Sequence, residues 1–184
     1  MKPFDVAVFV GSLRRESTNL KLAHALSRIA PASLALRFVE LAALPMYNGD
    51  LEGNRPEAVN HFTAECERAE AFLFVMPEYN RSLPAVLKNA IDWGSKPIER
   101  NVWRDKPAAM TGTSPGAIGT AVGQQHLRQI LGILGAAVVG GEAYLPFSRD
   151  VFDAEGNFAN EATREFMAAY LQRFAAFTGR LVDR

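Results

Sequence analysis

The sequence predicts a three-layer α/β fold in which a sheet of five parallel strands carries helices on both faces. Short apolar segments alternate along the chain with segments of helical periodicity, which is typical of repeated strand–helix units. Crossovers between parallel strands are right-handed, so few topologies remain. For a chain of 184 residues, expected to be one domain over 1–184, we predict the strand order 2-1-3-4-5.

The strands are predicted from short apolar runs. The first run is interrupted only by Asp5, and the third is apolar throughout, as in a strand buried on both faces. The fifth begins at 136–139 and can extend towards Leu145. In chain order the expected strands cover residues 4–10, 34–41, 71–76, 106–111 and the segment from 136.

The helices are predicted from apolar residues spaced three and four apart. Ser17 or Thr18 can cap the first helix, and Pro56 is compatible with the first turn of the second. A loop rich in Pro, Asn and Gly over 44–55 precedes the second helix, and a turn-rich loop over 147–160 precedes the last. The expected helices cover residues 19–29, 56–68, 83–93, 118–134 and 161–181.

Composition and charge argue against several kinds of partner. Lys and Arg number 20, as do Asp and Glu, so the formal net charge is zero and neither nucleic acid nor a membrane is expected as partner. The single cysteine, Cys66, permits no intrachain disulfide and is expected to be a buried thiol. No apolar run has the ~20 residues of a membrane span, and no signal peptide is recognised, so we expect a cytoplasmic protein. The three histidines lack the spacing of a metal site.

The loop after the first strand has the composition of a phosphate-binding turn. Its neutral donors and its two cations are Ser12, Ser17, Thr18, Asn19, Arg14 and Arg15. The helix that begins near Asn19 directs free N–H groups and the positive end of its dipole to the same place. A capped turn with solvated arginines has the same composition, so the loop alone leaves both interpretations open.

The turn after the third strand reaches the same edge of the predicted sheet, because strands 1 and 3 are neighbours. Pro77 and Pro84 stiffen its two ends. Between them, Glu78, Tyr79 and Asn80 offer an acceptor, a ring face and an amide, which suits the edge of a planar heterocycle. A polar surface turn is the competing interpretation.

The segment 111–119 after the fourth strand contains three glycines, which allow a ring to approach the backbone closely. Thr113 and Ser114 can hydrogen-bond ring carbonyls. Taken alone, this segment fits a helix-capping turn better. Three such loops at one edge nevertheless predict a site for a phosphorylated, flat-ringed ligand.

Several other sites known in α/β folds are absent. The chain contains neither G-x-G-x-x-G nor G-x-x-x-x-G-K-[ST], so neither a Rossmann-bound dinucleotide nor a P-loop-bound triphosphate is predicted. The first loop lacks the Cys-x5-Arg of a low-molecular-weight phosphatase, and Gly11 and Pro77 stand where a receiver domain needs Asp. A monophosphate such as that of FMN suits the short Ser/Thr-rich loop. No segment marks a pocket for the 2′-phosphate of NADPH.

Three motifs keep one order and spacing over nearly the whole chain. They are Gly11-Ser12-Leu13-Arg14…Ser17…Asn19, then Pro77-Glu78-Tyr79-Asn80…Pro84…Leu87-Lys88-Asn89-Ala90-Ile91-Asp92-Trp93, then Ser114-Pro115-Gly116…Gly119. This combination resembles the NAD(P)H-dependent FMN reductase family, and within it the bacterial quinone and chromate reductases. Arg81 departs from the family pattern, in which a small or aromatic residue follows the asparagine.

The resemblance implies a flavodoxin-like fold that holds FMN non-covalently, in a homodimer or homotetramer. By it, the FMN phosphate would be bound by Ser12, Arg14, Ser17 and Asn19. The isoalloxazine ring and ribityl chain would be lined by Pro77, Glu78, Tyr79 and Asn80, and the far side of the ring would be reached by Ser114 and Gly116.

The resemblance also implies an enzyme that transfers electrons from NAD(P)H to quinones, with chromate, azo compounds and free flavin as further candidate acceptors. Because the electron chemistry belongs to the flavin, we assign no catalytic residue and expect no metal. Two alternatives share the fold: a flavodoxin-type electron carrier without its own NAD(P)H turnover, and a flavin-binding module without turnover. Zero net charge disfavours the carrier, since such carriers are commonly strongly acidic around the flavin.

Overall fold

Parallel strands and helices alternate along the computed structural model, which describes residues 2–148 and 150–182. The strands are β1 (Phe4–Val10), β2 (Leu34–Phe38), β3 (Ala71–Val75), β4 (Pro107–Ser114), β5 (Ala137–Val138) and β6 (Tyr144–Pro146). The α-helices are α1 (Thr18–Ile29), α2 (Glu57–Arg68), α3 (Ala85–Gly94), α4 (Ala121–Ile133) and α5 (Glu161–Leu181), and short 3₁₀ turns cover Gly49–Asn54 and Ile98–Arg100.

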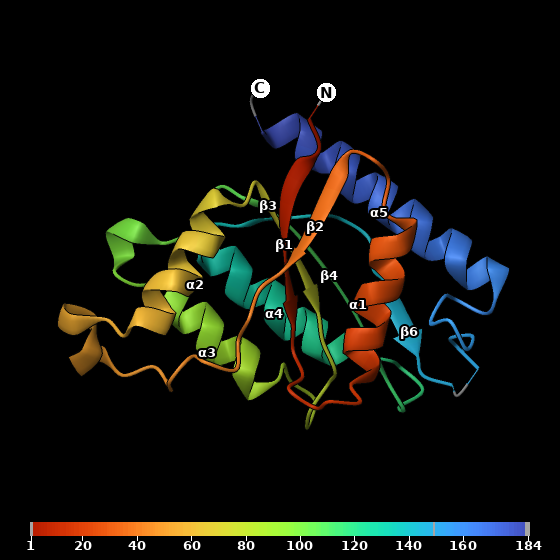
Figure 1. Cartoon of the computed structure of the whole chain (residues 1–184), viewed down its shortest axis with the longest axis horizontal. Coiled ribbons are helices and arrows are strands. Elements are labelled where there is room, and N and C mark those ends of the chain that lie inside the picture. Colours follow the sequence, from red (N-terminus) through yellow and green to blue (C-terminus); the bar gives the residue numbers. More distant parts are fainter. Residues whose placement is uncertain (1, 149, 183–184) are drawn as a thin grey trace.

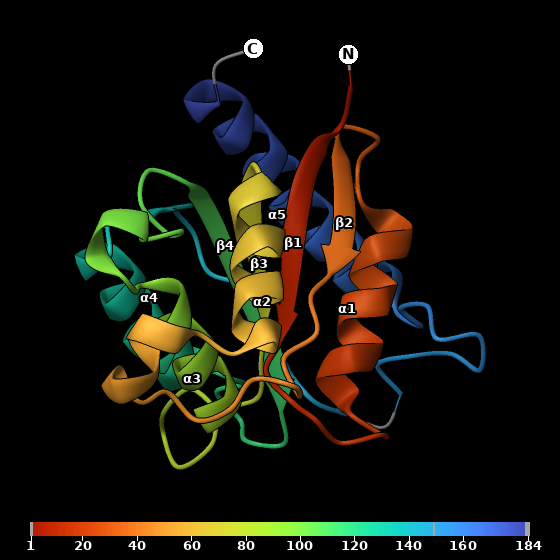
Figure 2. The ribbon, with the colours of Figure 1, turned by 60° about the vertical axis from the view of Figure 1, so that its left-hand side comes forward.

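The sheet lies between two layers of helices (Figure 1). Its order is β2-β1-β3-β4-β5, with β6 paired to β4. Turning the molecule shows α1 and α5 over one face and α2, α3 and α4 over the other (Figure 2). The predicted flavodoxin-like class and strand order are therefore confirmed.

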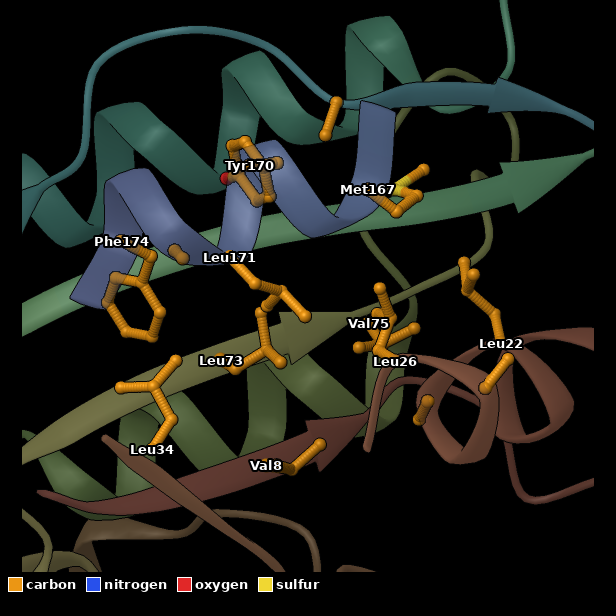
Figure 3. Packing of buried hydrophobic residues seen from close by; sticks show 14 of the residues in the cluster. Val8, Leu22, Leu26, Leu34, Leu73, Val75, Met167, Tyr170, Leu171 and Phe174 are labelled. Atoms are coloured by element: carbon orange, nitrogen blue, oxygen red, sulfur yellow. The ribbon is translucent and has the colours of Figure 1, made fainter. Parts of the chain in front are cut away.

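Side chains of β1 alternate between two apolar cores, as the twofold period of a strand requires. Val6 and Val8 pack with α1 and α5, where Leu26 and Leu171 are fully buried (Figure 3). Ala7 and Phe9 face the opposite core, which includes Cys66. The cysteine is a buried thiol, as predicted, and its burial raises its pKa.

The expectation of five strands is wrong in number, because the fifth strand is split into β5 and β6. Both pieces pair in parallel with β4, but the chain between Val138 and Tyr144 is two residues longer than the matching stretch of β4. Gly141 lies in this insertion with φ at +87°, a left-handed conformation that interrupts a strand. The β6 pairing also extends β4 to Ser114, so the third predicted loop begins as strand.

A tyrosine from α5 fills the hydrogen-bonding gap between β5 and β6. The Tyr170 hydroxyl accepts from the Met110 N–H (3.1 Å) and donates to the Met110 carbonyl oxygen (2.8 Å). Met110 lies in β4 between the positions that pair with β5 and those that pair with β6. Tyr170 is 1% exposed, so water cannot replace it there.

We expect Tyr170→Phe to lower the free energy of unfolding by about 2 kcal/mol or more, because two buried backbone groups of Met110 lose their partner while the ring still fits. Urea denaturation measures the change. Tyr144→Phe is the matched control, since the Tyr144 hydroxyl binds the exposed side chain of Gln125. Equal stabilities of the two variants would contradict the role given to Tyr170.

None of the helices in the described ranges is both long and apolar enough to span a membrane. Other element boundaries differ from expectation by a few residues. α4 begins at Ala121 rather than near Ile118, because Gly119 has φ at +59° and Thr120 takes the capping position. These shifts leave the loops after β1, β3 and β4 at one edge of the sheet, at the lower side of Figure 1.

Candidate functional site

A cavity of about 320 Å³, called the rim cavity below, opens where the loops after β1, β3 and β4 meet. Among the predicted site residues, those that line it are Ser12, Arg14, Ser17, Asn19, Pro77, Glu78, Tyr79 and Ser114. Asn80 and Gly116 do not line it. Thus the tertiary structure brings together residues from three loops that are distant in sequence, at the topological switch point between β1 and β3.

The first loop enters α1 through a side-chain cap. The Ser17 hydroxyl oxygen accepts from the Leu20 N–H (3.2 Å), which makes Ser17 the N-cap of the helix. The first turn of α1 contains no acidic residue. The amino end of this helix therefore presents a positive potential to the rim cavity, as an anion such as a phosphate requires.

Asn19 joins this loop to β4. Its side-chain amide donates to the Thr113 carbonyl oxygen and its side-chain oxygen accepts from the Thr113 N–H, both at 2.9 Å. The side chain is buried and lines the rim cavity. Since both polar groups are occupied by protein backbone, Asn19 positions β4 against the first loop.

The turn after β3 is a two-residue hairpin. Tyr79 and Ser82 exchange two backbone hydrogen bonds of 3.0 Å, and Asn80 and Arg81 between them have φ at +51° and +64°. Both residues are thus left-handed, which is the type I′ geometry that asparagine tolerates and arginine does not favour. The hairpin leaves Tyr79 at the rim cavity, 47% exposed, and directs Asn80 away from the cavity lining.

Glu78 anchors this hairpin to α4. Its side chain is 7% exposed, and its carboxylate accepts from the Gly123 N–H (2.9 Å) in the first turn of α4. The other carboxylate oxygen lies 3.5 Å from the Arg81 guanidinium. A carboxylate at the amino end of a helix compensates the helix dipole, so Glu78 orders the hairpin and α4 together.

Thr113 carries a buried polar atom without a partner. Its side-chain oxygen has no hydrogen bond within residues 2–148 and 150–182, although the residue is 1% exposed and lines the rim cavity. A buried hydroxyl left unpaired costs about 1–3 kcal/mol. A polar atom of a bound ligand could form the missing hydrogen bond with this hydroxyl. The cavity therefore suits a ligand that has such an atom as well as a phosphate for the α1 amino end.

Three lining residues, Glu16, Pro115 and Phe147, were given no role in the site by the sequence analysis. Phe147 directly follows β6. Since the carboxyl ends of parallel strands meet at one edge, a predicted strand extended to Pro146 would have placed Phe147 at the site. Glu16 forms an ion pair with Lys21 (3.1 Å), which reduces its repulsion of an anion in the cavity.

The sequence model of the family described as NADPH-dependent FMN reductase matches residues 4–150. The chain belongs to this family. Its fold, its FMN cofactor and NAD(P)H donor, and its enzymatic character agree with the sequence-based predictions. The polar rim cavity suits FMN, because the α1 amino end can receive its phosphate and the Thr113 hydroxyl can bond one of its polar atoms.

Members and neighbours of the FMN reductase family cover nearly the whole chain. A quinone reductase from Pseudomonas putida is 47% identical over 176 residues, which are 95% of this chain and 94% of that protein. A 2-hydroxy-1,4-benzoquinone reductase from Burkholderia sp is 43% identical over 173 residues, 94% of each. Among solved structures, FerB, a flavoenzyme NAD(P)H:(acceptor) oxidoreductase from Paracoccus denitrificans, matches with a TM-score of 0.93 at 38% identity, covering 97% of this chain and 98% of FerB.

Thr113→Val is expected to weaken FMN binding about tenfold while leaving the free energy of unfolding of the apoprotein unchanged or higher. Valine keeps the shape of threonine and removes a hydroxyl that has no partner within the described residues, so the apoprotein loses no hydrogen bond. Fluorescence titration of the apoprotein with FMN measures the affinity. Unchanged affinity would show that the hydroxyl does not contact the cofactor.

Proposed function

We propose that this protein reduces quinones with electrons from NAD(P)H, using FMN held at the rim cavity. The observation that carries the proposal is the convergence of the three loops on one cavity that joins a helix amino end, an arginine and an unpaired buried hydroxyl. The quinone reductases that are 43% and 47% identical to this chain support the choice of acceptor.

In this proposal the first loop holds the FMN phosphate. Ser12, Arg14 and Ser17 line the rim cavity beside the α1 amino end. The Arg14 guanidinium has no ion pair or hydrogen bond to the part of the chain that the structure describes, so it is available to an anion. Asn19 acts through the backbone of Thr113, which it holds in place.

The second and third loops would hold the ring and the ribityl chain. Pro77, Glu78 and Tyr79 from the second loop and Ser114 from the third line the rim cavity. Asn80 contributes through the turn that presents Tyr79, and Gly116 lies in the exposed loop that follows Ser114. When bound, FMN supplies the redox chemistry, which is hydride acceptance from NAD(P)H and two-electron delivery to the acceptor.

An apolar cleft next to the rim cavity suits a flat, uncharged acceptor. The cleft has a volume of about 440 Å³, and Leu13, Tyr79, Pro84 and Val86 are among its walls. It shares Ser12, Arg14 and Tyr79 with the rim cavity, so a quinone there would lie beside a flavin. Chromate, azo compounds and free flavin are further acceptors that we propose for this enzyme, in a cytoplasmic homodimer or homotetramer.

The absorption spectrum of the purified protein, followed by anaerobic titration with NADPH and NADH, tests this function. We expect a yellow protein whose flavin is bleached by a reduced nicotinamide and recovers its colour on addition of 1,4-benzoquinone. Colourless protein that does not take up added FMN would refute the cofactor assignment. Bound flavin that no reduced nicotinamide bleaches would instead indicate an electron carrier or a module without turnover.

A further inference from the structure

A third cavity also borders the first loop. It has a volume of about 400 Å³ and lies between the end of β1, the start of α1 and the segment that follows β2. It shares Ser12 and Arg14 with the rim cavity. Figure 2 shows β1, β2 and α1 side by side. We call it the β2 cavity.

The floor of the β2 cavity is apolar and partly aromatic. Val10, Leu20, Phe38 and Leu41 line it, and Phe38 is itself half-buried. The His24 ring stacks on Phe38 with 4.7 Å between the ring centroids, which holds the phenyl ring in place. An apolar cavity with one fixed aromatic ring is suited to a flat heterocycle such as adenine.

The β2 cavity is lined by one cation, Arg15, that does not line the flavin site. Arg15 lines the β2 cavity but neither the rim cavity nor the apolar cleft. Its guanidinium is exposed and forms no ion pair or hydrogen bond to any residue in 2–148 or 150–182. An unpaired arginine at the mouth of a cavity is a ready site for a phosphate.

A carboxylate, that of Glu40, also lines the β2 cavity. Glu40 follows β2 and lines the cavity, and one of its oxygens accepts from the Ala42 N–H (2.7 Å), which holds it beside the loop. In dinucleotide-binding sheets an acidic residue after the second strand accepts from the ribose 2′-hydroxyl, while a nearby arginine accommodates a 2′-phosphate. This chain places one group of each kind at one cavity.

We propose that the β2 cavity binds the adenosine end of the reduced nicotinamide dinucleotide, with Arg15 contacting the 2′-phosphate of NADPH and Glu40 facing the ribose. This inference rests on the proposed function, because it assumes that the dinucleotide's other end reaches a flavin at the rim cavity. Arg14 and Ser12, which line both cavities, lie between the two ends of such a ligand. Quinones carry no phosphate. Apart from FMN, the dinucleotide is therefore the ligand of the reaction that could use the Arg15 guanidinium.

Isothermal titration of the FMN-loaded protein with adenosine 2′,5′-bisphosphate and with 5′-AMP tests the inference. FMN occupies the rim cavity, so the nucleotides cannot bind there, and the Arg15 variant shows whether the remaining binding is at the β2 cavity. We expect the bisphosphate to bind more tightly than 5′-AMP. Arg15→Gln should weaken bisphosphate binding about tenfold or more, the value of one charge-assisted hydrogen bond, and 5′-AMP binding by less than about threefold.

Two further variants sharpen the test. Glu40→Gln should strengthen bisphosphate binding, because it removes a negative charge that opposes the 2′-phosphate. Arg104→Gln removes an exposed arginine that lines none of the three cavities, and it should leave both affinities unchanged. A bisphosphate that does not bind, or that binds Arg15→Gln as tightly as the unsubstituted protein, would overturn the inference.

The flavin itself separates this inference from the proposed function. If NADPH bleaches the bound flavin while Arg15→Gln binds the bisphosphate normally, the adenosine site is elsewhere and the proposed function stands. If neither nicotinamide bleaches the flavin, the proposed function fails whatever the titrations show.

Discussion

Gly112→Ala is expected to lower the free energy of unfolding by at least about 4 kcal/mol, a loss that few single substitutions cause. A Cβ atom on Gly112 would lie 1.8 Å from the carbonyl oxygen of Met76. That oxygen belongs to the backbone where β3 ends, and the adjacent Met76 N–H donates to Thr111 (3.0 Å). Neither strand can move away without breaking the pairing between them.

The effect should extend to the site, because Met76 directly precedes Pro77 and Gly112 directly precedes Thr113. Displacing β3 from β4 would separate two walls of the rim cavity. We therefore expect any folded fraction of Gly112→Ala to bind FMN more weakly. Urea denaturation and FMN titration on the same preparation measure both losses.

Gly132→Ala is the matched control. Gly132 lies in the last turn of α4, and apart from its chain neighbours and its own helix backbone no atom of the described residues is within 4 Å of the place where its Cβ would stand. Alanine is favoured over glycine in a helix by up to about 1 kcal/mol, so this variant should be as stable as the unsubstituted protein or slightly more stable. If Gly112→Ala unfolds at the same urea concentration as the unsubstituted protein, the close contact between β3 and β4 is not present.

Asn19→Leu is expected to destabilise the apoprotein by about 3 kcal/mol. The change leaves the N–H and the carbonyl oxygen of Thr113 without partners in a buried place, and each such group costs about 1–3 kcal/mol. Leucine keeps the branched shape of asparagine, but its methyl groups are larger than the amide groups they replace, so steric strain adds to this loss. Thermal and urea unfolding without FMN measure the loss.

The absence of FMN makes this experiment decisive about the role of Asn19. A residue that only bound the phosphate would leave the apoprotein as stable as before. A residue that positions β4 destabilises it whether or not cofactor is present. Asn60→Leu is the control, since Asn60 is exposed and its side chain donates to the Arg55 carbonyl oxygen (3.2 Å). Equal effects of the two substitutions would contradict the positioning role.

Local patterns predicted those elements whose ends carry their own signals. The strand Phe4–Val10 and the helix Glu161–Leu181 have the predicted bounds, and Ser17, one of two candidates, is the cap of α1. The split of the fifth strand was missed because periodicity does not show a two-residue insertion between β5 and β6. That feature depends on the Tyr170 hydroxyl, which comes from a helix far along the chain.

For the site, the sequence by itself determined which loops meet, because parallel strands of known order bring their carboxyl ends to one edge. Only the tertiary structure decided what each side chain does there. It directs Asn19 to the backbone of Thr113, Glu78 to the amino end of α4, and Asn80 away from the cavity lining. It also places Glu40 and Arg15 in the lining of one cavity. Strand order follows from local periodicity and chain handedness, whereas the partner of a polar side chain depends on atoms that only packing brings within reach.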